Sequence, residues 1–176
     1  PSRLRPDRHP ERAQRARDKV LQRLAEYQVW PAQRIDEARE EPLLLAAWRR
    51  LVDGLPTGEQ PPRLFIVPRH PQRFDEVAAA IEAMGWRVSR RSAWGALGAD
   101  AIPDAQALAA DVWLGDSMGE MPAYYACADI GLLGGSFAPL GGQNLIEAAA
   151  CGCPLIVGPS TFNFAEAAEQ GLAAGA

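Results

Sequence analysis

Apolar residues along this chain follow two alternating patterns. Short apolar runs, bounded by proline, glycine or polar residues, predict buried strands over residues 63–67, 86–89, 111–114, 130–133 and 154–157. Between these runs, apolar residues recur three and four positions apart, which predicts helices over residues 10–27, 43–52, 72–84, 121–128, 145–151 and 164–170. This alternation indicates an α/β fold with a Rossmann-like parallel sheet and helices on both faces.

The segments without either pattern predict connections. Residues 1–9 are rich in proline and arginine, and we expect a linker there. Loops are expected over 54–62 and 90–110, whereas the polar residues 33–41 follow no clear pattern. We expect residues 10–176 to form one domain of a longer protein, because the chain starts without Met and stops after a glycine- and alanine-rich segment.

Composition argues against several classes of function. The 176 residues carry a net charge of −4, and the mixed signs within residues 1–50 argue against a nucleic-acid partner. No apolar run reaches the roughly 18 residues of a membrane span, so the sequence predicts a soluble fragment. Three cysteines without a neighbouring histidine predict reduced thiols and no metal site, and the two in alanine-rich segments are expected to be buried.

Charge is unevenly distributed between the two parts of the chain. All 18 basic residues lie within residues 1–100, whereas residues 101–176 hold eight acidic residues and no Lys or Arg. Any full positive charge that meets an anion in the second part must therefore come from an arginine earlier in the chain.

One glycine-rich stretch, residues 134–147, predicts an anion-binding site. It follows the apolar run 130–133, carries two glycine pairs and leads into an alanine-rich helix. Glycines allow sharp turns and a close approach to a ligand, and the first turn of a helix offers unpaired N–H groups at the positive end of its dipole. Ser136 in this stretch either adds a hydroxyl to a phosphate or caps a turn.

Two further loops, 68–71 and 115–120, are expected at the same edge of the sheet. Ligands of such folds bind at the carboxyl ends of parallel strands, and each loop follows a predicted strand. In the first loop, Arg69 and His70 supply N–H donors that suit a phosphate or a carboxylate. Together with residues 134–147, these loops can form one site.

Two segments allow both a structural and a functional interpretation. Ser117 and Glu120 fit a capping box, but the backbone of residues 118–119 can also face a flat base. Asn144 and Glu147 fit the N-cap and first turn of a helix. The Glu147 carboxylate, if turned outward, also suits the two hydroxyls of a ribose, because it offers two acceptor oxygens.

Taken together, four segments resemble the 3-deoxy-D-manno-octulosonic acid (Kdo) transferases. They are Val67–Phe74, Val112–Glu120, Gly134–Asn144 and Gly158–Phe164, in the same order and at similar spacing as in that family. The resemblance implies the C-terminal, donor-binding domain of a two-domain GT-B glycosyltransferase. Such an enzyme moves Kdo from CMP-Kdo to lipid A precursor in lipopolysaccharide synthesis.

The resemblance also implies what the rest of such a protein supplies. The N-terminal domain, absent from this chain, would hold the acceptor site, the catalytic carboxylate and the membrane contact at the cytoplasmic face of the bacterial inner membrane. No cofactor or metal is implied. The isolated fragment is expected to be inactive.

The family motifs imply roles for individual residues. They assign phosphate contacts to Pro68 and Arg69, cytosine contacts to residues 118–120 and ribose contacts to residues 144–147, while a basic residue that stabilises the leaving phosphate corresponds to Arg5. The predicted CMP-donor-binding residues are Pro68, Arg69, His70, Met118, Gly119, Glu120, Gly135, Ser136, Asn144, Leu145, Ile146 and Glu147.

Two departures from the family pattern leave alternatives open. Gln143 stands where the family usually has histidine, and the family's Ser-Thr-x-x-Gly-Glu motif is not recognisable in residues 33–41. A GT-B domain that binds a UDP-sugar and a divergent, non-catalytic relative are therefore competing hypotheses.

Overall fold

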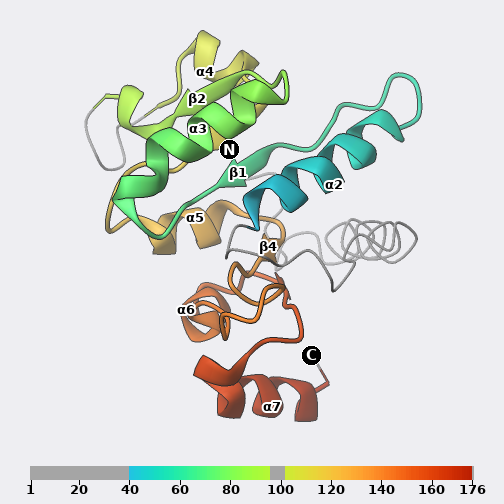
Figure 1. Ribbon diagram of the computed structural model, residues 1–176, viewed down its shortest axis with the longest axis vertical. Helices are drawn as coiled ribbons and strands as arrows, with labels where there is room; N and C mark the ends of the chain where they lie inside the picture. The colour runs from blue at the N-terminus through green and yellow to red at the C-terminus, as the bar shows by residue number, and fades with distance from the viewer. Residues whose placement is uncertain (1–39, 96–101, 176) are drawn as a thin grey trace. The chain divides into compact units, whose positions relative to one another are not determined.

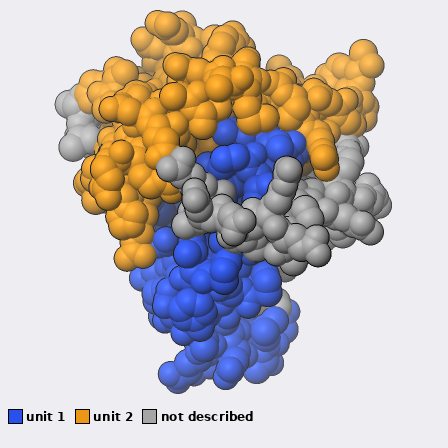
Figure 2. Space-filling model, in the orientation of Figure 1, with its two compact units in different colours: residues 1–47, 120–176 blue, residues 48–119 orange. Residues whose placement is uncertain are grey.

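The computed structural model describes residues 40–95 and 102–175 (Figure 1). The chain divides into two compact units, one of residues 1–47 and 120–176 and the other of residues 48–119 (Figure 2). We call them unit 1 and unit 2. Each contains its own parallel sheet, and helix α2 (Glu41–Asp53) contributes residues to both.

Unit 2 is built on a three-stranded parallel sheet. Its strands are β1 (Leu64–Ile66), β2 (Val88–Arg90) and β3 (Val112–Leu114), in the order β1-β3-β2. The remaining elements are short helices, namely η1 (Pro71–Arg73), α3 (Phe74–Ala83), η2 (Arg91–Ala93) and α4 (Ala105–Ala109). Helix α3 packs against β2 and β3 (Figure 1).

The two faces of this sheet differ in character because side chains alternate along a strand. Leu64 and Ile66 of β1 share one face with Val112 and Leu114 of β3, and all four are buried. The opposite face carries Phe65 and Trp113, whose rings meet edge to face at 5.9 Å. The Trp113 indole N–H donates to the carbonyl of Ala107 in α4, so α4 lies on this second face.

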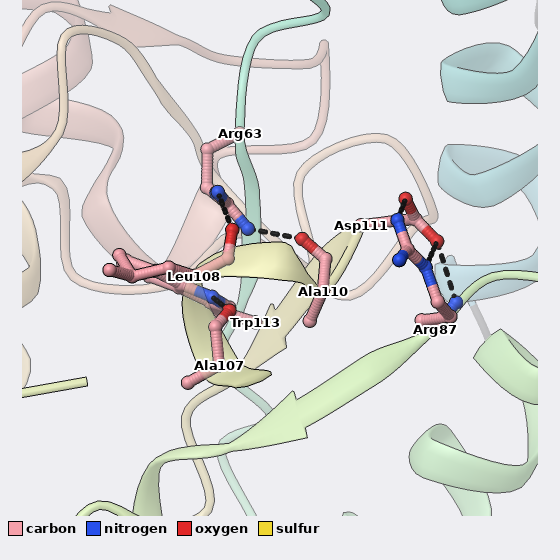
Figure 3. A network of polar contacts seen from close by, with 7 residues as sticks. All are labelled: Arg63, Arg87, Ala107, Leu108, Ala110, Asp111 and Trp113. Carbon is pink, nitrogen blue, oxygen red and sulfur yellow. Dashed lines mark hydrogen bonds and ion pairs between the residues drawn. The ribbon is translucent and has the colours of Figure 1, made fainter. Parts of the chain in front are cut away.

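Polar contacts fix the segments that enter strands β2 and β3 (Figure 3). The Arg63 guanidinium donates to the carbonyl oxygens of Leu108 and Ala110 and lies 4.6 Å from the centroid of the Trp113 ring. Arg87 binds Asp111 through two side-chain hydrogen bonds of 2.8 and 3.0 Å. These hydrogen bonds hold the pKa of the Asp111 carboxyl below its usual range.

Unit 1 contains a two-stranded parallel sheet of β4 (Gly131–Leu132) and β5 (Leu155–Ile156). Its helices are α5 (Met121–Cys127), α6 (Leu145–Ala150), η3 (Phe162–Phe164) and α7 (Ala165–Ala173). Helix α6 packs against α5, α7 and β5. Leu133, Ala138, Ala148 and Cys153 are the buried apolar residues of this unit after residue 120.

Most sequence predictions that fall on described residues are confirmed. The α/β class with parallel strands is confirmed, although the strands hydrogen-bond as one sheet of three and one of two. All five predicted strands form, each shorter than its apolar run. The prediction of a loop over 90–110 is wrong in part, because this segment contains η2 and α4. The N-cap of α4 is Asp104, whose side chain accepts a hydrogen bond from the backbone N–H of Ala107. The predicted linker 1–9 and helix 10–27 lie outside the described residues, and the single domain 10–176 stays a prediction.

Other expectations concern metals, membranes and thiols. Within residues 40–95 and 102–175, no group of three His, Cys, Asp or Glu side chains is placed to hold a metal ion. No helix in the same residues combines the length and the apolar character needed to cross a membrane. The three cysteines are free. Cys153 is buried and Cys151 is half-buried, but the prediction of burial is wrong for Cys127, which is exposed.

Candidate functional site

The loops after β1 and β3 begin at the same edge of the unit 2 sheet. Ile66 pairs in register with Leu114, and the backbone N–H of Gly115 donates to the carbonyl of Ile66 at 2.8 Å. The segment Pro68–His70 therefore begins beside residues 115–119. Pro68 is buried, whereas Arg69 and His70 are exposed. The structure thus brings together two of the three loops predicted from the sequence.

The carboxyl end of β2 adds charged residues that sequence reasoning missed. The side chain of Asp116 is 4% exposed and accepts hydrogen bonds from the backbone N–H and the hydroxyl of Ser92 at 2.8 and 2.7 Å. Arg90 lies 3.7 Å from the same carboxylate and 2.7 Å from Asp75. Because Arg90 ends a strand parallel to β3, its position at this edge follows from the alternation of strands and helices.

The turn at Met118 and Gly119 presents backbone to solvent. Met118 is 63% exposed, and Gly119 has a φ of +80°, which favours glycine. A Cβ at Gly119 would meet no atom within 4 Å. A flat ring can therefore approach this turn closely without displacing protein atoms.

The capping box predicted for Ser117 and Glu120 is wrong. Helix α5 begins at Met121, and Glu120 occupies the N-cap position without a side-chain cap. The Glu120 carboxylate instead accepts a hydrogen bond from the hydroxyl of Tyr124 at 3.0 Å. Pro122 at the second helical position supplies a φ suited to the first turn and removes the need for one N–H partner.

In unit 1, the glycine-rich loop 134–143 folds back on itself before α6. The backbone N–H groups of Gly142 and Gln143 donate to the carbonyls of Gly135 and Gly134, at 2.8 and 3.0 Å. Gly135 and Gly142 have φ values of +73° and +76°. This conformation requires glycine, because a Cβ at positive φ is strained.

The anion that occupies this loop is a carboxylate of the chain itself. Glu40 Oε2 accepts a hydrogen bond from the backbone N–H of Gly135 at 2.5 Å. Its Oε1 accepts from the N–H groups of Phe137 and Ala138, at 2.9 and 2.6 Å. Sequence reasoning predicted an anion site here but missed Glu40, since residues 33–41 showed no periodicity. The only sequence signal was a loop rich in N–H donors beside a segment without Lys or Arg.

Ser136 supports the loop from inside. Its side chain is fully buried, and its hydroxyl donates to the carbonyl of Leu133 at 2.5 Å and accepts from the N–H of Gly158 at 2.8 Å. Both hydrogen-bonding functions of the hydroxyl are thus engaged by the protein, which supports the turn-capping interpretation. A side chain at Gly158 would overlap the backbone of Ser136.

Asn144 is the N-cap of α6, as predicted. Its side-chain oxygen accepts hydrogen bonds from the backbone N–H groups of Ile146 and Glu147, at 3.1 and 3.4 Å. Within the described residues, no hydrogen bond or ion pair engages the Glu147 carboxylate. Burial raises the pKa of the Tyr125 hydroxyl, and the negative charge of Glu147 raises it further. The Glu147 carboxylate, in the first turn of α6, therefore remains available to a hydroxyl donor.

The predicted site residues fall on both units. Residues 68–70 and 118–119 belong to unit 2, whereas residues 120, 135–136 and 144–147 belong to unit 1. The grouping of all three loops around one ligand stays a prediction. Arg5, the proposed leaving-group stabiliser, lies outside the described residues.

Comparisons with known proteins agree with the resemblance read from the sequence. The chain is 56% identical over 115 residues to a 3-deoxy-D-manno-octulosonic acid transferase of Bordetella pertussis, a match that covers 65% of this chain and 25% of that protein. It is 35% identical over 138 residues to the enzyme of the same name from Haemophilus influenzae, covering 78% of this chain and 29% of that protein. No protein-family model matches the sequence.

A solved structure resembles most of this chain. It is the C-terminal CMP-Kdo-binding domain of WaaA from Acinetobacter baumannii, with a TM-score of 0.60 and 27% identity over 86% of this chain and 75% of that domain. The resemblance to Kdo transferases is therefore confirmed in both sequence and fold. The chain spans between 25% and 29% of the length of the transferases from Bordetella pertussis and Haemophilus influenzae.

Proposed function

We propose, from this similarity to the Kdo transferases, that the chain is the donor-binding domain of a glycosyltransferase and that its ligand is CMP-Kdo. The observation that carries the proposal is the likeness to a CMP-Kdo-binding domain along most of the chain. The arrangement of exposed polar groups on each unit supports it, because these groups suit the three chemically distinct parts of CMP.

Each part of the nucleotide has a matching group in the chain. Arg69, exposed at the carboxyl edge of the unit 2 sheet, offers a planar fork of N–H donors to the phosphate. The exposed backbone of Met118 and Gly119 suits the flat cytosine. The Glu147 carboxylate, which no described residue binds, suits the ribose hydroxyls. His70 lies next to the phosphate contact, Glu120 next to the cytosine contact, and Leu145 and Ile146 next to the ribose contact.

In the proposed reaction, the whole enzyme transfers Kdo to lipid A precursor with inversion at the anomeric carbon. This domain would orient the donor and stabilise the departing CMP through Arg69 and the start of α6. The acceptor site, the catalytic carboxylate and contact with the cytoplasmic face of the inner membrane would come from the N-terminal domain. The domain alone is expected to bind the donor without transferring it.

Calorimetric titration of the chain with CMP tests the proposal. Arg69→Ala and Glu147→Ala should each weaken CMP binding by about 1–3 kcal/mol, since hydrogen bonds to charged groups contribute about that much. Arg50→Ala and Glu169→Ala remove the same side-chain types from exposed helical positions, and these controls should bind like the wild type. Unchanged binding in Arg69→Ala and Glu147→Ala would contradict the assigned contacts.

A further inference from the structure

The backbone N–H groups of residues 135, 137 and 138 form a concave cluster of donors, of the kind that binds anions. We call this cluster the loop nest. Glu40 fills it with both carboxylate oxygens, at the three distances given above. All these residues belong to unit 1, and the Glu40 side chain comes from a position at least 95 residues earlier in the chain.

A filled nest cannot serve the donor phosphate at the same time. A phosphate oxygen would have to displace a carboxylate that already accepts three charge-assisted hydrogen bonds, which are stronger than bonds between neutral groups. Nor does the segment after residue 100 supply a Lys or Arg that could compensate for two anions in one place. The loop nest is therefore a structural site for the carboxylate of Glu40.

The conformation that Glu40 fixes is passed on to helix α6. Gly135 is bound to Glu40 through its N–H and to Gly142 through its carbonyl. Gln143, paired with Gly134, stands immediately before the N-cap Asn144. A change in the shape of residues 134–138 must therefore move the start of α6, where Glu147 lies in the first turn.

We propose that Glu40 is a positioning residue for nucleotide binding: by filling the loop nest, its carboxylate sets the place from which α6 presents Glu147 to the ribose. This role rests on the proposed function, since it concerns the same CMP site. The glycine-rich loop then acts on donor binding indirectly, and the anion that it binds is the Glu40 carboxylate.

Three variants test this role in the full chain by calorimetry with CMP. Glu40→Ala empties the nest and so releases the start of α6. It should lower CMP affinity at least about tenfold, which corresponds to 1.4 kcal/mol. Glu40→Gln should lie between Glu40→Ala and the wild type, because its amide keeps one acceptor oxygen but points an N–H₂ group at an N–H donor. Glu169→Ala, an exposed glutamate on α7 of the same unit, should bind CMP like the wild type.

Chemical rescue separates positioning from a general loss of stability. Acetate carries the same two oxygens as the missing side chain, so acetate should restore CMP affinity to Glu40→Ala and leave the wild type unchanged. Chloride at equal ionic strength should restore nothing. In NMR spectra, the amide resonances of Gly135, Phe137 and Ala138 should shift in Glu40→Ala and return towards their wild-type positions with acetate, whether or not CMP is present.

The outcomes distinguish this inference from the proposed function. Wild-type affinity in Glu40→Ala, or a failure of acetate to rescue it, overturns the positioning role while CMP binding by the wild type stands. Tighter CMP binding by Glu40→Ala also overturns it, because Glu40 would then compete with the donor phosphate. A wild type that fails to bind CMP overturns the proposed function, and the amide response to acetate alone then reports on the nest.

Discussion

Replacing Ser136 by alanine removes the hydroxyl that joins the glycine-rich loop to the segment after β5. The variant loses two hydrogen bonds, one to the carbonyl of Leu133 and one from the N–H of Gly158. A typical intramolecular hydrogen bond contributes about 1 kcal/mol net, and a partner left unsatisfied costs about 1–3 kcal/mol. Because Ser136 is fully buried, water cannot replace the hydroxyl without rearrangement. We therefore expect Ser136→Ala to lower the free energy of unfolding by about 2 kcal/mol.

Urea titration followed by circular dichroism measures this loss, and thermal unfolding should show a Tm lower by about 4–8 °C for a chain of this size. Ser160→Ala is the matched control. Ser160 accepts one hydrogen bond, from the N–H of Gly141 at 2.9 Å, so its loss should cost about half as much. The two variants share the same substitution and differ in the number of hydrogen bonds lost and in burial, because Ser136 is fully buried and Ser160 is half-buried.

A different pattern would refute the structural role of this hydroxyl. If Ser136→Ala unfolds within about 0.5 kcal/mol of the wild type, as neutral surface substitutions do, the hydroxyl does not hold the loop. If Ser136→Ala keeps the wild-type stability but loses CMP affinity by more than about tenfold, or 1.4 kcal/mol, the loop is intact and the hydroxyl contacts the donor phosphate directly. That result would restore the alternative interpretation of Ser136 that the sequence left open.

Perturbations at three further positions test the helix cap and the charges around the sheets. Asn144→Ala should destabilise the chain by about 1 kcal/mol through loss of the α6 cap and also weaken CMP binding, whereas Asn144→Ser should keep both in calorimetry and urea unfolding. The Arg87 hydrogen bonds depress the folded-state pKa of Asp111, so this stabilisation is fully present above the unfolded-state pKa of about 3.9 and is lost as pH falls through the folded-state value. Asp111→Asn should therefore lower the urea midpoint slightly at pH 7, since the pair is exposed, and the difference should close in acid. Burial raises the pKa of Asp129, so Asp129→Asn should instead raise the urea midpoint at pH 7. A common response of both variants to pH would contradict these assignments.

The elements of the fold were largely predictable because they depend on local patterns. Apolar runs such as Leu64–Ile66 form the buried strands, and Asn144 caps α6 as its side chain and position suggest. The capping box at Ser117 failed because the same short pattern fits a turn that ends one residue before the helix. Helix α4 was missed because five residues are too few to show a helical period.

The positions of the candidate site residues were predictable only where these residues stand in local motifs. Arg69 and Met118 follow strands, and parallel strands place such residues at one edge of the sheet. Glu40 could not be predicted, because its partners lie 95 to 98 positions away and a contact at that separation leaves no periodic trace. The glycine pairs indicated an anion, but backbone N–H donors do not distinguish a phosphate from a carboxylate of the protein.

Competition between CMP and UDP on the wild-type chain tests the central claim most directly. A calorimetric titration with CMP should give saturable heat with a Kd at or below the millimolar range, which corresponds to about −4 kcal/mol or better, and UDP at equal concentration should not displace it. Absence of heat at millimolar CMP would favour a non-catalytic relative. Equal or preferred binding of UDP would contradict the assignment to CMP-Kdo and favour a domain that binds a UDP-sugar.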